Sequence, residues 1–336
     1  MQIGVVFPQT EIGSDRGAIR AYAERAEELG YAHLLAYDHV LGADPTVHEP
    51  WRGPYDIDTT FHEPFVLFGF LAAVTTMELV TGIIILPQRQ TALVAKQAAE
   101  IDLLTLGKLR LGVGLGWNAV EYEALGTDFS NRGRRIGEQV ELMRSLWTQR
   151  AVTHHGEYEH VTGAGLAPRP IQQPIPVWFG VASEPAFRRA GRLADGWFPM
   201  LPPGSRLDEA RTIVDDAASA AGRDPQTIGM EGRVSWSADG RVARVVDHVG
   251  RWRAAGATRI GWNGNRSRRH VITPAGANQG ESEAARRPRC GSTRKALGPS
   301  RSSNSPPGKP PVEVARATAE CPSKSLEQRS GGHGIP

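Results

Sequence analysis

The chain has 336 residues, 40% of them hydrophobic, which is enough for one large barrel domain or two ordinary domains. It contains no apolar run long enough to span a bilayer and no basic segment before its first apolar residues. We therefore expect a cytoplasmic protein without a membrane segment or a secretory signal. Both cysteines, Cys290 and Cys321, lie near the end of the chain and form no C-x-x-C pair. This argues against a disulfide framework, a zinc site and a cysteine nucleophile.

The net charge of +3 hides a division of the chain after Asn263. Residues 264–336 carry 13 basic and 5 acidic side chains and no Phe, Tyr or Trp, whereas residues 1–263 carry 26 basic and 31 acidic ones. A segment of that composition cannot bury enough apolar surface to offset its ordering entropy. We expect a folded body over residues 1–263 and a disordered basic tail over residues 264–336. The tail has no aromatic residues for base stacking, so no nucleic-acid partner is expected.

Strands and helices alternate along the body, beginning with an apolar strand at residues 3–7 that Pro8 closes. Ser14 is expected to cap the helix that follows, and Gly30 to end it. The apolar run at residues 79–86 predicts one strand buried on both faces, followed by a helix that Thr91 caps. The predicted strands begin near residues 3, 33, 80, 110, 177, 197, 228 and 258. Eight βα units of this size predict a single (β/α)8 TIM barrel of the α/β class, with an open doubly wound sheet as the weaker alternative.

A barrel normally covers its eighth strand with a helix, but here the low-complexity tail follows that strand at once. We therefore expect a barrel that lacks its last helix. The abrupt change of composition favours a coding sequence that has left its reading frame, with a natural disordered extension as the alternative. A barrel with one uncovered strand face is expected to be less stable than a complete one.

Ligands of β/α barrels bind at the carboxyl ends of the strands, so the residues that follow each strand are the candidate site. The second strand ends at Asp38 and His39. Histidine is a residue type suited to proton transfer, and His39 follows an acid, but a structural histidine fits these facts equally well. The glycines of residues 112–116 resemble a dinucleotide fingerprint without its third glycine or its acidic partner, so a Rossmann site is rejected.

Three other segments allow two interpretations each. The small-residue turn at residues 180–183 opens a helix and fits either a phosphate site or an ordinary Ser-capped helix. The long loop of residues 41–62 fits either a lid or a surface loop with packed aromatic side chains. The histidines of residues 154–160 fit a hairpin around Gly156 better than a metal site, because no further ligands cluster nearby. No metal is therefore expected.

Four motifs occur in a characteristic order along residues 1–262. They are Tyr37-Asp38-His39-Val40, Leu86-Pro87-Gln88-Arg89, the glycine-rich residues 112–118 with residues 121–126, and Ala194-Asp195-Gly196-Trp197. Together they resemble the luciferase-like monooxygenase superfamily, and most closely its branch of oxidoreductases that use coenzyme F420, a 5-deazaflavin. Members that use FMN share much of the same pattern.

The resemblance implies a luciferase-like barrel with a flavin or deazaflavin ring across the carboxyl ends of the strands. Asp38 would then hydrogen-bond the polar edge of the ring, and His39 would act as a proton donor or base. Ile84 and Ile85 would form a bulge, often with a non-prolyl cis peptide, that supports the other face of the ring. The remaining cofactor contacts would come from Asn118 and from the phosphate-binding turn of Gly180, Val181, Ala182 and Ser183.

The resemblance also restricts the reaction. Sugar-phosphate dehydrogenases of this family carry a glutamate after the fourth strand, where this chain has Leu115, so sugar-phosphate oxidation is disfavoured. We expect an F420-dependent oxidoreductase of a small organic substrate. The resemblance also implies a homodimer, because family members are commonly dimers. The alternatives are an FMN-dependent monooxygenase with a separate flavin reductase and a catalytically impaired barrel. The candidate substrate contacts, which suggest an apolar or aromatic ligand, are Trp51, Tyr55, Trp117 and Trp197.

Overall fold

Eight parallel strands form the wall of a closed barrel in the computed structural model, which describes residues 1–235 and 242–264. The strands are β1 (Gln2–Val6), β2 (His33–Ala36), β3 (Glu78–Thr81), β5 (Leu109–Gly114), β8 (Val177–Val181), β9 (Gly196–Pro199), β10 (Gly229–Ser235) and β11 (Arg259–Asn263). They follow the order β3-β2-β1-β11-β10-β9-β8-β5, and the pairing of β3 with β5 closes the ring. The predicted β/α barrel is confirmed, and an open sheet is ruled out because no edge remains.

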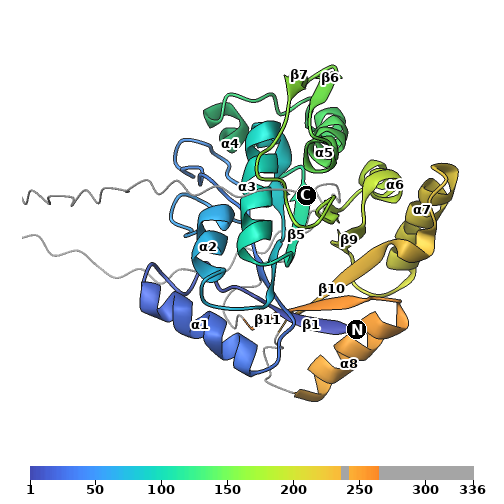
Figure 1. Ribbon diagram of the computed structural model, residues 1–336. Coiled ribbons are helices and arrows are strands. Elements are labelled where there is room, and N and C mark those ends of the chain that lie inside the picture. Colours follow the sequence, from blue (N-terminus) through green and yellow to red (C-terminus); the bar gives the residue numbers. More distant parts are fainter. Residues whose placement is uncertain (236–241, 265–336) are drawn as a thin grey trace, which may run out of the picture. The chain divides into compact units, whose positions relative to one another are not determined.

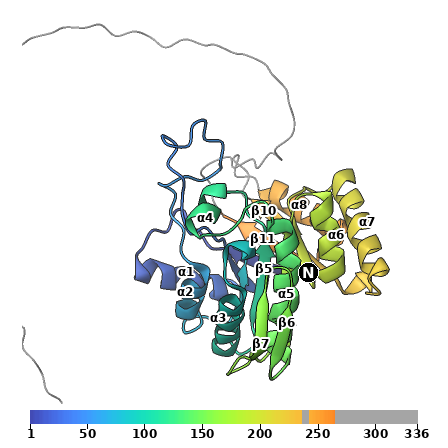
Figure 2. The same cartoon turned by 90° about the horizontal axis from the view of Figure 1, so that it is seen from above.

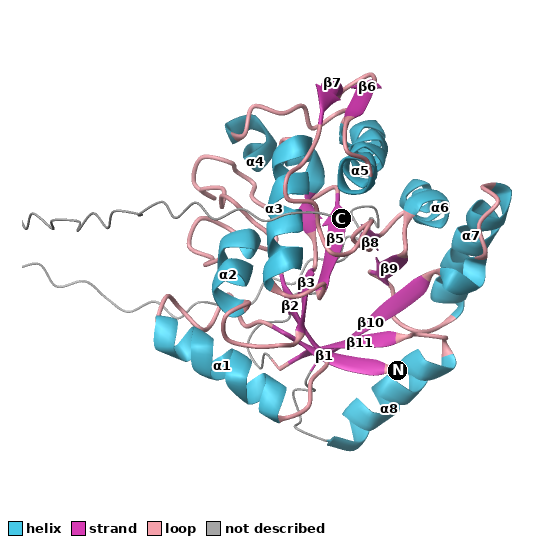
Figure 3. Ribbon diagram, in the orientation of Figure 1, coloured by secondary structure: helices cyan, strands magenta, loops and turns pink. Residues whose placement is uncertain are grey.

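Helices surround the strands on the outside of the barrel (Figures 1 and 3). They are α1 (Arg16–Glu28), α2 (Pro64–Leu71), α3 (Thr91–Leu104), α5 (Arg132–Thr148), α6 (Glu184–Leu193), α7 (Ser205–Ala220) and α8 (Val242–Ala254). The short elements are α4 (Ala119–Ala124), β4 (Ile84–Ile85), and the 3-10 turns η1 (Leu86–Gln88) and η2 (Pro225–Thr227). Within the described ranges, no helix is long and apolar enough to cross a membrane. The predicted hairpin around Gly156 is confirmed as β6 (Val152–His155) paired with β7 (His160–Ala164).

Three local predictions were wrong. Asp15, not Ser14, caps α1, because its side chain accepts a hydrogen bond from the Ala18 N–H at 2.7 Å. Thr91 is the first residue of α3 rather than its cap. The single strand expected at residues 79–86 is two short strands, β3 and β4, separated by a cis peptide bond between Gly82 and Ile83. A side chain on Gly82 would meet Leu35 at 2.4 Å, so the chain passes too close to β2 for any larger residue.

A small apolar cluster fills the middle of the barrel, separate from the larger core between the strands and the helices. It consists of Val6, Leu35, Val80, Trp178 and Phe198. The two rings, Trp178 and Phe198, lie 5.4 Å apart between their centroids. Neighbouring strands make room for them with glycines, because a Cβ on Gly196 would meet the Trp178 ring at 2.2 Å. The interior is therefore packed rather than open.

Charged side chains close the amino-terminal end of the barrel below this cluster. Arg110 forms an ion pair with Glu231 at 2.6 Å, and Glu231 also contacts His33 Nε2 at 3.2 Å. Glu78 bridges Arg110, at 3.2 Å, and Arg259. The Arg110 guanidinium lies 4.4 Å from the centroid of the Trp178 ring, a cation–π contact. Because these ion pairs are buried and mutually neutralised, a ligand site is expected at the opposite end.

The predictions that concern the end of the chain are not tested. The disordered tail, the missing eighth helix and the frameshift all fall on residues 265–336, outside the described residues.

Candidate active site

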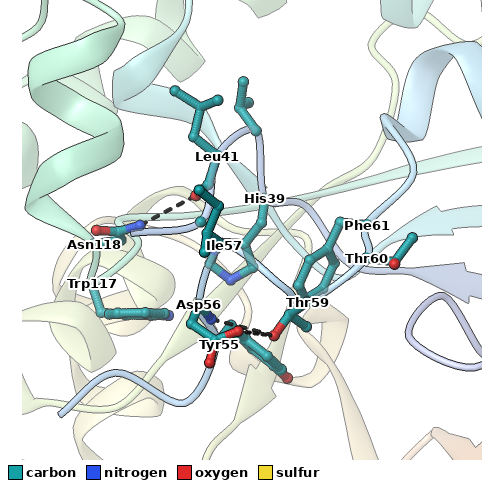
Figure 4. A pocket seen from close by; sticks show the side chains of 12 residues that line it. His39, Leu41, Tyr55, Asp56, Ile57, Thr59, Thr60, Phe61, Trp117 and Asn118 are labelled. Carbon is teal, nitrogen blue, oxygen red and sulfur yellow. Dashed lines mark hydrogen bonds between the residues drawn. The ribbon is translucent and has the colours of Figure 1, made fainter. Parts of the chain in front are cut away.

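A cavity of about 340 Å³ lies at the carboxyl-terminal end of the barrel. The segment after β2, the segment after β5 and the long loop of residues 41–62 meet there, and Figure 2 shows this loop and α4 at the same end. The lining residues are His39, Val40, Leu41, Gly42, Tyr55, Asp56, Ile57, Thr59, Thr60, Phe61, Trp117 and Asn118 (Figure 4). The fold thus brings His39, Tyr55, Trp117 and Asn118 together, as the sequence predicted.

His39 is held by Glu121, a buried glutamate in the first turn of α4. The Nδ1 atom of His39 lies 3.1 Å from Oε2 of Glu121, whose side chain is fully buried. The other oxygen, Oε1, accepts the backbone N–H groups of Val40 at 2.7 Å and Leu41 at 3.2 Å. One carboxylate therefore fixes both the ring of His39 and the backbone that follows it.

The protonation of this pair follows from its surroundings. Burial alone would raise the pKa of Glu121, but the hydrogen bonds from His39 and from two backbone N–H groups outweigh it, so its pKa lies below the ordinary value. Glu121 is then ionised at neutral pH and can only accept hydrogen bonds. Nδ1 of His39 must carry the proton in this contact, which leaves Nε2 as the nitrogen available for chemistry.

Three aromatic rings surround the imidazole of His39. The ring centroids of Phe61, Trp117 and Tyr55 lie 4.8, 5.6 and 5.2 Å from that of His39. Figure 4 shows these side chains around the cavity, with the loop of residues 41–62 supplying Tyr55 and Phe61. The His39 side chain is only 11% exposed as a result. The aromatic side chains of the loop thus cover much of the histidine, an arrangement that fits both the lid and the packed surface loop.

Asp38 anchors the backbone beside this cavity. Its Oδ2 accepts the Ile85 N–H at 2.9 Å, and its Oδ1 accepts Nη2 of Arg89 at 2.8 Å. Burial raises the pKa of Asp38, while Arg89 and the Ile85 N–H oppose that rise. Arg89 also pairs with Glu63 at 3.0 Å. Both oxygens of Asp38 have protein partners, so its hydrogen bond to a ring edge stays a prediction.

The bulge expected at Ile84 and Ile85 lies slightly earlier in the chain. The cis peptide joins Gly82 to Ile83, and the side chains of Ile84 and Ile85 are buried in the wall at 0% and 2% exposure. Ile83 is only partly buried and packs on the inner apolar cluster together with Tyr37. The side chain that faces the ligand end of the barrel is therefore that of Ile83.

Asn118 lines the cavity and also fixes the backbone around it, whereas Trp51 lies behind the lining residues. The Oδ1 of Asn118 caps α4 by accepting the Val120 N–H at 3.1 Å, and its Nδ2 donates to the Leu41 carbonyl at 3.3 Å. Trp51 lies against Trp117, with ring centroids 5.7 Å apart. Trp51 itself is not among the lining residues, so it supports the lid rather than facing the cavity.

Trp197 does not reach the site. It is 2% exposed and packs against Phe187 of α6, with ring centroids 6.1 Å apart. On a strand, successive side chains point to opposite faces. Phe198 points into the barrel, so Trp197 points outward to the helices. The structure contradicts its prediction as a substrate contact.

The predicted phosphate turn joins β8 to α6. Gly180 and Val181 end the strand, whereas Ala182 and Ser183 are exposed. Ser183 stands at the N-cap position but its side chain makes no capping hydrogen bond. Proline within the first turn removes one N–H donor, and the acidic Glu184 beside it pairs with Arg188 at 2.7 Å. Phosphate binding by Gly180, Val181, Ala182 and Ser183 stays a prediction.

The described residues include no group of three or more His, Cys, Asp or Glu side chains that could hold a metal ion. Within the hairpin, His154 is instead paired with Glu138 at 3.1 Å.

Sequence reasoning missed two residues of the site. Glu121 was visible as an acid in the first turn of a short helix, but only the fold brings it to His39, which is 82 residues away in the chain. Ile83 gave no signal of its own, because it stands in a run of isoleucines that is typical of an unbroken strand.

Comparisons with known proteins agree with this architecture. The family model described as luciferase-like monooxygenase matches residues 1–291. The uncharacterized protein Rv0953c of Mycobacterium tuberculosis is 32% identical over 258 residues, covering 74% of this chain and 87% of that protein. An F420-dependent glucose-6-phosphate dehydrogenase of Intrasporangium calvum is 30% identical over 239 residues, covering 68% of this chain and 67% of that protein.

A solved structure shares the fold at lower identity. An F420-dependent secondary alcohol dehydrogenase, in complex with an F420-acetone adduct, superposes with a TM-score of 0.65 at 18% identity. The match covers 78% of this chain and 92% of the other. The chain belongs to the luciferase-like monooxygenase family.

Proposed function

We propose that this protein is an oxidoreductase that moves a hydride between a deazaflavin of the F420 type and a small organic substrate. The observation that carries the proposal is the His39–Glu121 pair, 3.1 Å apart, which faces an aromatic cavity at the ligand end of the barrel. The choice of cofactor is supported by the relatives of about 30% identity that are named F420-dependent dehydrogenases.

The residues at this end fit a flat ring. Tyr37 and Ile83 are partly buried and cap the inner apolar cluster, so they form an apolar floor. Two glycines border this floor, and a Cβ on Gly114 or Gly180 would meet Ile83 at 2.7 or 3.1 Å. Any larger residue at these positions would displace Ile83. The floor and its glycine border would hold the ring, and the turn at residues 180–183 would hold the phosphate.

A bound deazaflavin supplies the hydride chemistry, and the protein supplies orientation, proton transfer and a dry site. Reduction of a substrate carbonyl needs a proton donor, and oxidation of an alcohol needs a base. Nε2 of His39 can serve either role, because Glu121 holds Nδ1 and compensates a positive charge on the imidazole. In the loop of residues 41–62, the rings of Tyr55 and Phe61 pack against the imidazole and would help to exclude water once a ligand fills the cavity.

The identity of residue 115, a leucine, restricts the class of substrate. Leu115 stands at the position where the resemblance places a glutamate in sugar-phosphate dehydrogenases, and its carbonyl accepts the Tyr122 hydroxyl at 2.6 Å. A leucine cannot donate or accept a proton there. We propose that the substrate is not a sugar phosphate, although relatives with that activity share the fold.

Titration with both cofactors tests the proposal. We expect the full chain to bind F420 tightly and FMN at least tenfold more weakly, measured by fluorescence of the ligand. Tight FMN binding without F420 binding would favour the monooxygenase that the family name suggests, working with a separate flavin reductase. A folded sample that binds neither ligand would identify a catalytically impaired barrel.

A further inference from the structure

Arg233 points into the ligand end of the barrel. It lies on β10 two residues after Glu231, so both side chains share the inward face of the strand. Glu231 contacts His33, the first residue of β2, at the amino-terminal end. Arg233 contacts Tyr37, the residue after β2, and its guanidinium lies 5.3 Å from the ring centroid. Tyr37 directly precedes Asp38 and His39. Arg233 therefore stands at the level of the candidate active site.

The other inward-facing arginines are neutralised by carboxylates. Arg89 pairs with Asp38 and Glu63 at the same end of the barrel. Arg110 and Arg259 pair with glutamates at the opposite end. Arg233 differs, because no Asp or Glu within residues 1–235 and 242–264 forms an ion pair with it.

Arg233 is not one of the residues that line the cavity, but it contacts Tyr37, which directly precedes Asp38 and His39, and its charge acts on a side chain of the cavity wall. Burial raises the pKa of Tyr55 to about 12, and the positive charge of Arg233 opposes that rise. Tyr55 lines the cavity beside His39. A partly buried cation beside an aromatic ring is screened less than one in water and attracts an anion strongly.

We propose that Arg233 binds an anionic group, such as a carboxylate, on the substrate, so that the substrate class is small aromatic or apolar acids. This rests on the proposed function insofar as the cavity at His39 is the substrate site. A planar guanidinium holds a carboxylate with two parallel hydrogen bonds, and the rings of Tyr55, Phe61 and Trp117 suit an apolar body. An anionic part of the cofactor could use the same chemistry, and the test separates the two.

The test compares benzoate with benzamide, which has the same shape but no charge, by calorimetric titration of the full chain without cofactor. We expect the wild-type protein to prefer benzoate by about 10- to 100-fold, as for a charge-assisted hydrogen bond. In Arg233→Met that preference should fall to within about twofold. Arg20→Met is the matched control, because it removes one positive charge from an exposed pair on α1. It should keep the full preference.

Several results would overturn the proposal. They are equal binding of the two probes by the wild-type protein, no binding of either, and a benzoate preference that survives in Arg233→Met. Circular dichroism checks the fold of each variant, and Arg233→Gln, which is shorter and uncharged, replaces Arg233→Met if the latter does not fold.

The same samples are titrated with F420. Unchanged F420 affinity in Arg233→Met supports the substrate assignment, whereas a loss of tenfold or more assigns the charge to the cofactor and contradicts it. If the wild-type protein does not bind F420 but keeps its preference for benzoate, the proposed function is contradicted and the anion site at Arg233 is still supported.

Discussion

His33, the first residue of β2, and His39, three residues after β2 ends, lie at opposite ends of the barrel, and each contacts a buried glutamate at nearly the same distance. His33 lies 3.2 Å from Glu231 at the amino-terminal end, and His39 lies 3.1 Å from Glu121 at the carboxyl-terminal end. The two pairs differ in their surroundings. Glu231 also binds Arg110, and the His33 side chain is fully buried. His39 faces a cavity lined by aromatic rings.

The difference shows that a His–Glu pair is structural or chemical according to what surrounds it. At the amino-terminal end, Nε2 of His33 contacts the glutamate and Nδ1 is buried without a protein partner in the part of the chain that the structure describes. No substrate can reach either nitrogen. At the carboxyl-terminal end, Nδ1 of His39 is held and Nε2 is left for a ligand. We therefore expect mutations of the first pair to change stability and mutations of the second to change turnover.

The largest expected effect is on turnover in His39→Ala. Removing a positioned acid or base should lower turnover roughly 10²- to 10⁴-fold, while cofactor affinity stays within about twofold. The measurement is steady-state kinetics with any substrate that the wild-type protein converts, alongside a cofactor titration. His33→Ala is the matched control and should lower the melting temperature while leaving the turnover of the folded fraction near the wild-type value. Equal losses of turnover and affinity in His39→Ala would indicate a packing role.

Glu231→Ala should have the largest effect on stability. It leaves the buried Arg110 without its closest partner, and breaking a buried ion pair typically costs about 3–5 kcal/mol of the free energy of unfolding. Urea unfolding followed by circular dichroism measures this. Glu24→Ala removes the glutamate of an exposed Arg–Glu pair on α1 and should cost no more than about 1 kcal/mol. Similar losses in the two variants would contradict the assignment of a structural role to the buried network.

Acid should weaken the same network. Burial alone would raise the pKa of Glu231, but Arg110 and His33 outweigh it and lower the pKa to about 2. Because the folded value lies below the unfolded value of 4.5, the stabilisation is fully present above about pH 4.5. It is lost as the pH falls from there toward 2. Urea midpoints across this window should fall more steeply in the wild-type protein than in Glu231→Gln, and parallel slopes would show that Glu231 does not contribute.

Glu121→Gln is a more conservative test of the His39–Glu121 pair than His39→Ala. Glutamine keeps an acceptor for the Val40 N–H but removes the charge that fixes the proton on Nδ1 of His39. A hydrogen bond to a charged group contributes about 1.5–3 kcal/mol, so turnover should fall roughly 10- to 100-fold with little change in melting temperature. Glu123→Gln, on the exposed side of α4, is the control and should behave as wild type. A large loss of stability with unchanged turnover would make Glu121 structural like Glu231.

The smallest effect is expected at Trp197. Because it packs outward on Phe187, Trp197→Phe should cost about 1–2 kcal/mol of stability and leave the KM for substrate unchanged. Trp117→Phe, in the cavity wall, should instead raise KM. If Trp197→Phe raises KM as much as Trp117→Phe does, Trp197 contacts the substrate and its assignment as an outward-packing residue is wrong.

Much of the barrel could be predicted because its signals are local. Apolar runs, helix-ending glycines such as Gly30 and the alternation of strand and helix are properties of neighbouring residues. The position of His39 at the ligand face followed from its strand number alone. Prediction failed where a distant contact overrides the local pattern. Gly82 and Ile83 continue an apolar run, but a cis peptide bond joins them between β3 and β4, and the Leu35 side chain leaves no room for a Cβ on Gly82.

The sequence by itself determined the eight strands of the barrel wall, the end of the barrel at which the candidate site residues gather and the family motifs around Asp38 and His39. Only the tertiary structure decided which glutamate meets each histidine, because Glu231 and Glu121 lie 198 and 82 residues from their partners. It also decided that Trp197 points outward while Arg233 points inward. Side-chain direction on a strand depends on register with its neighbours, and a shift of one residue would reverse every such assignment.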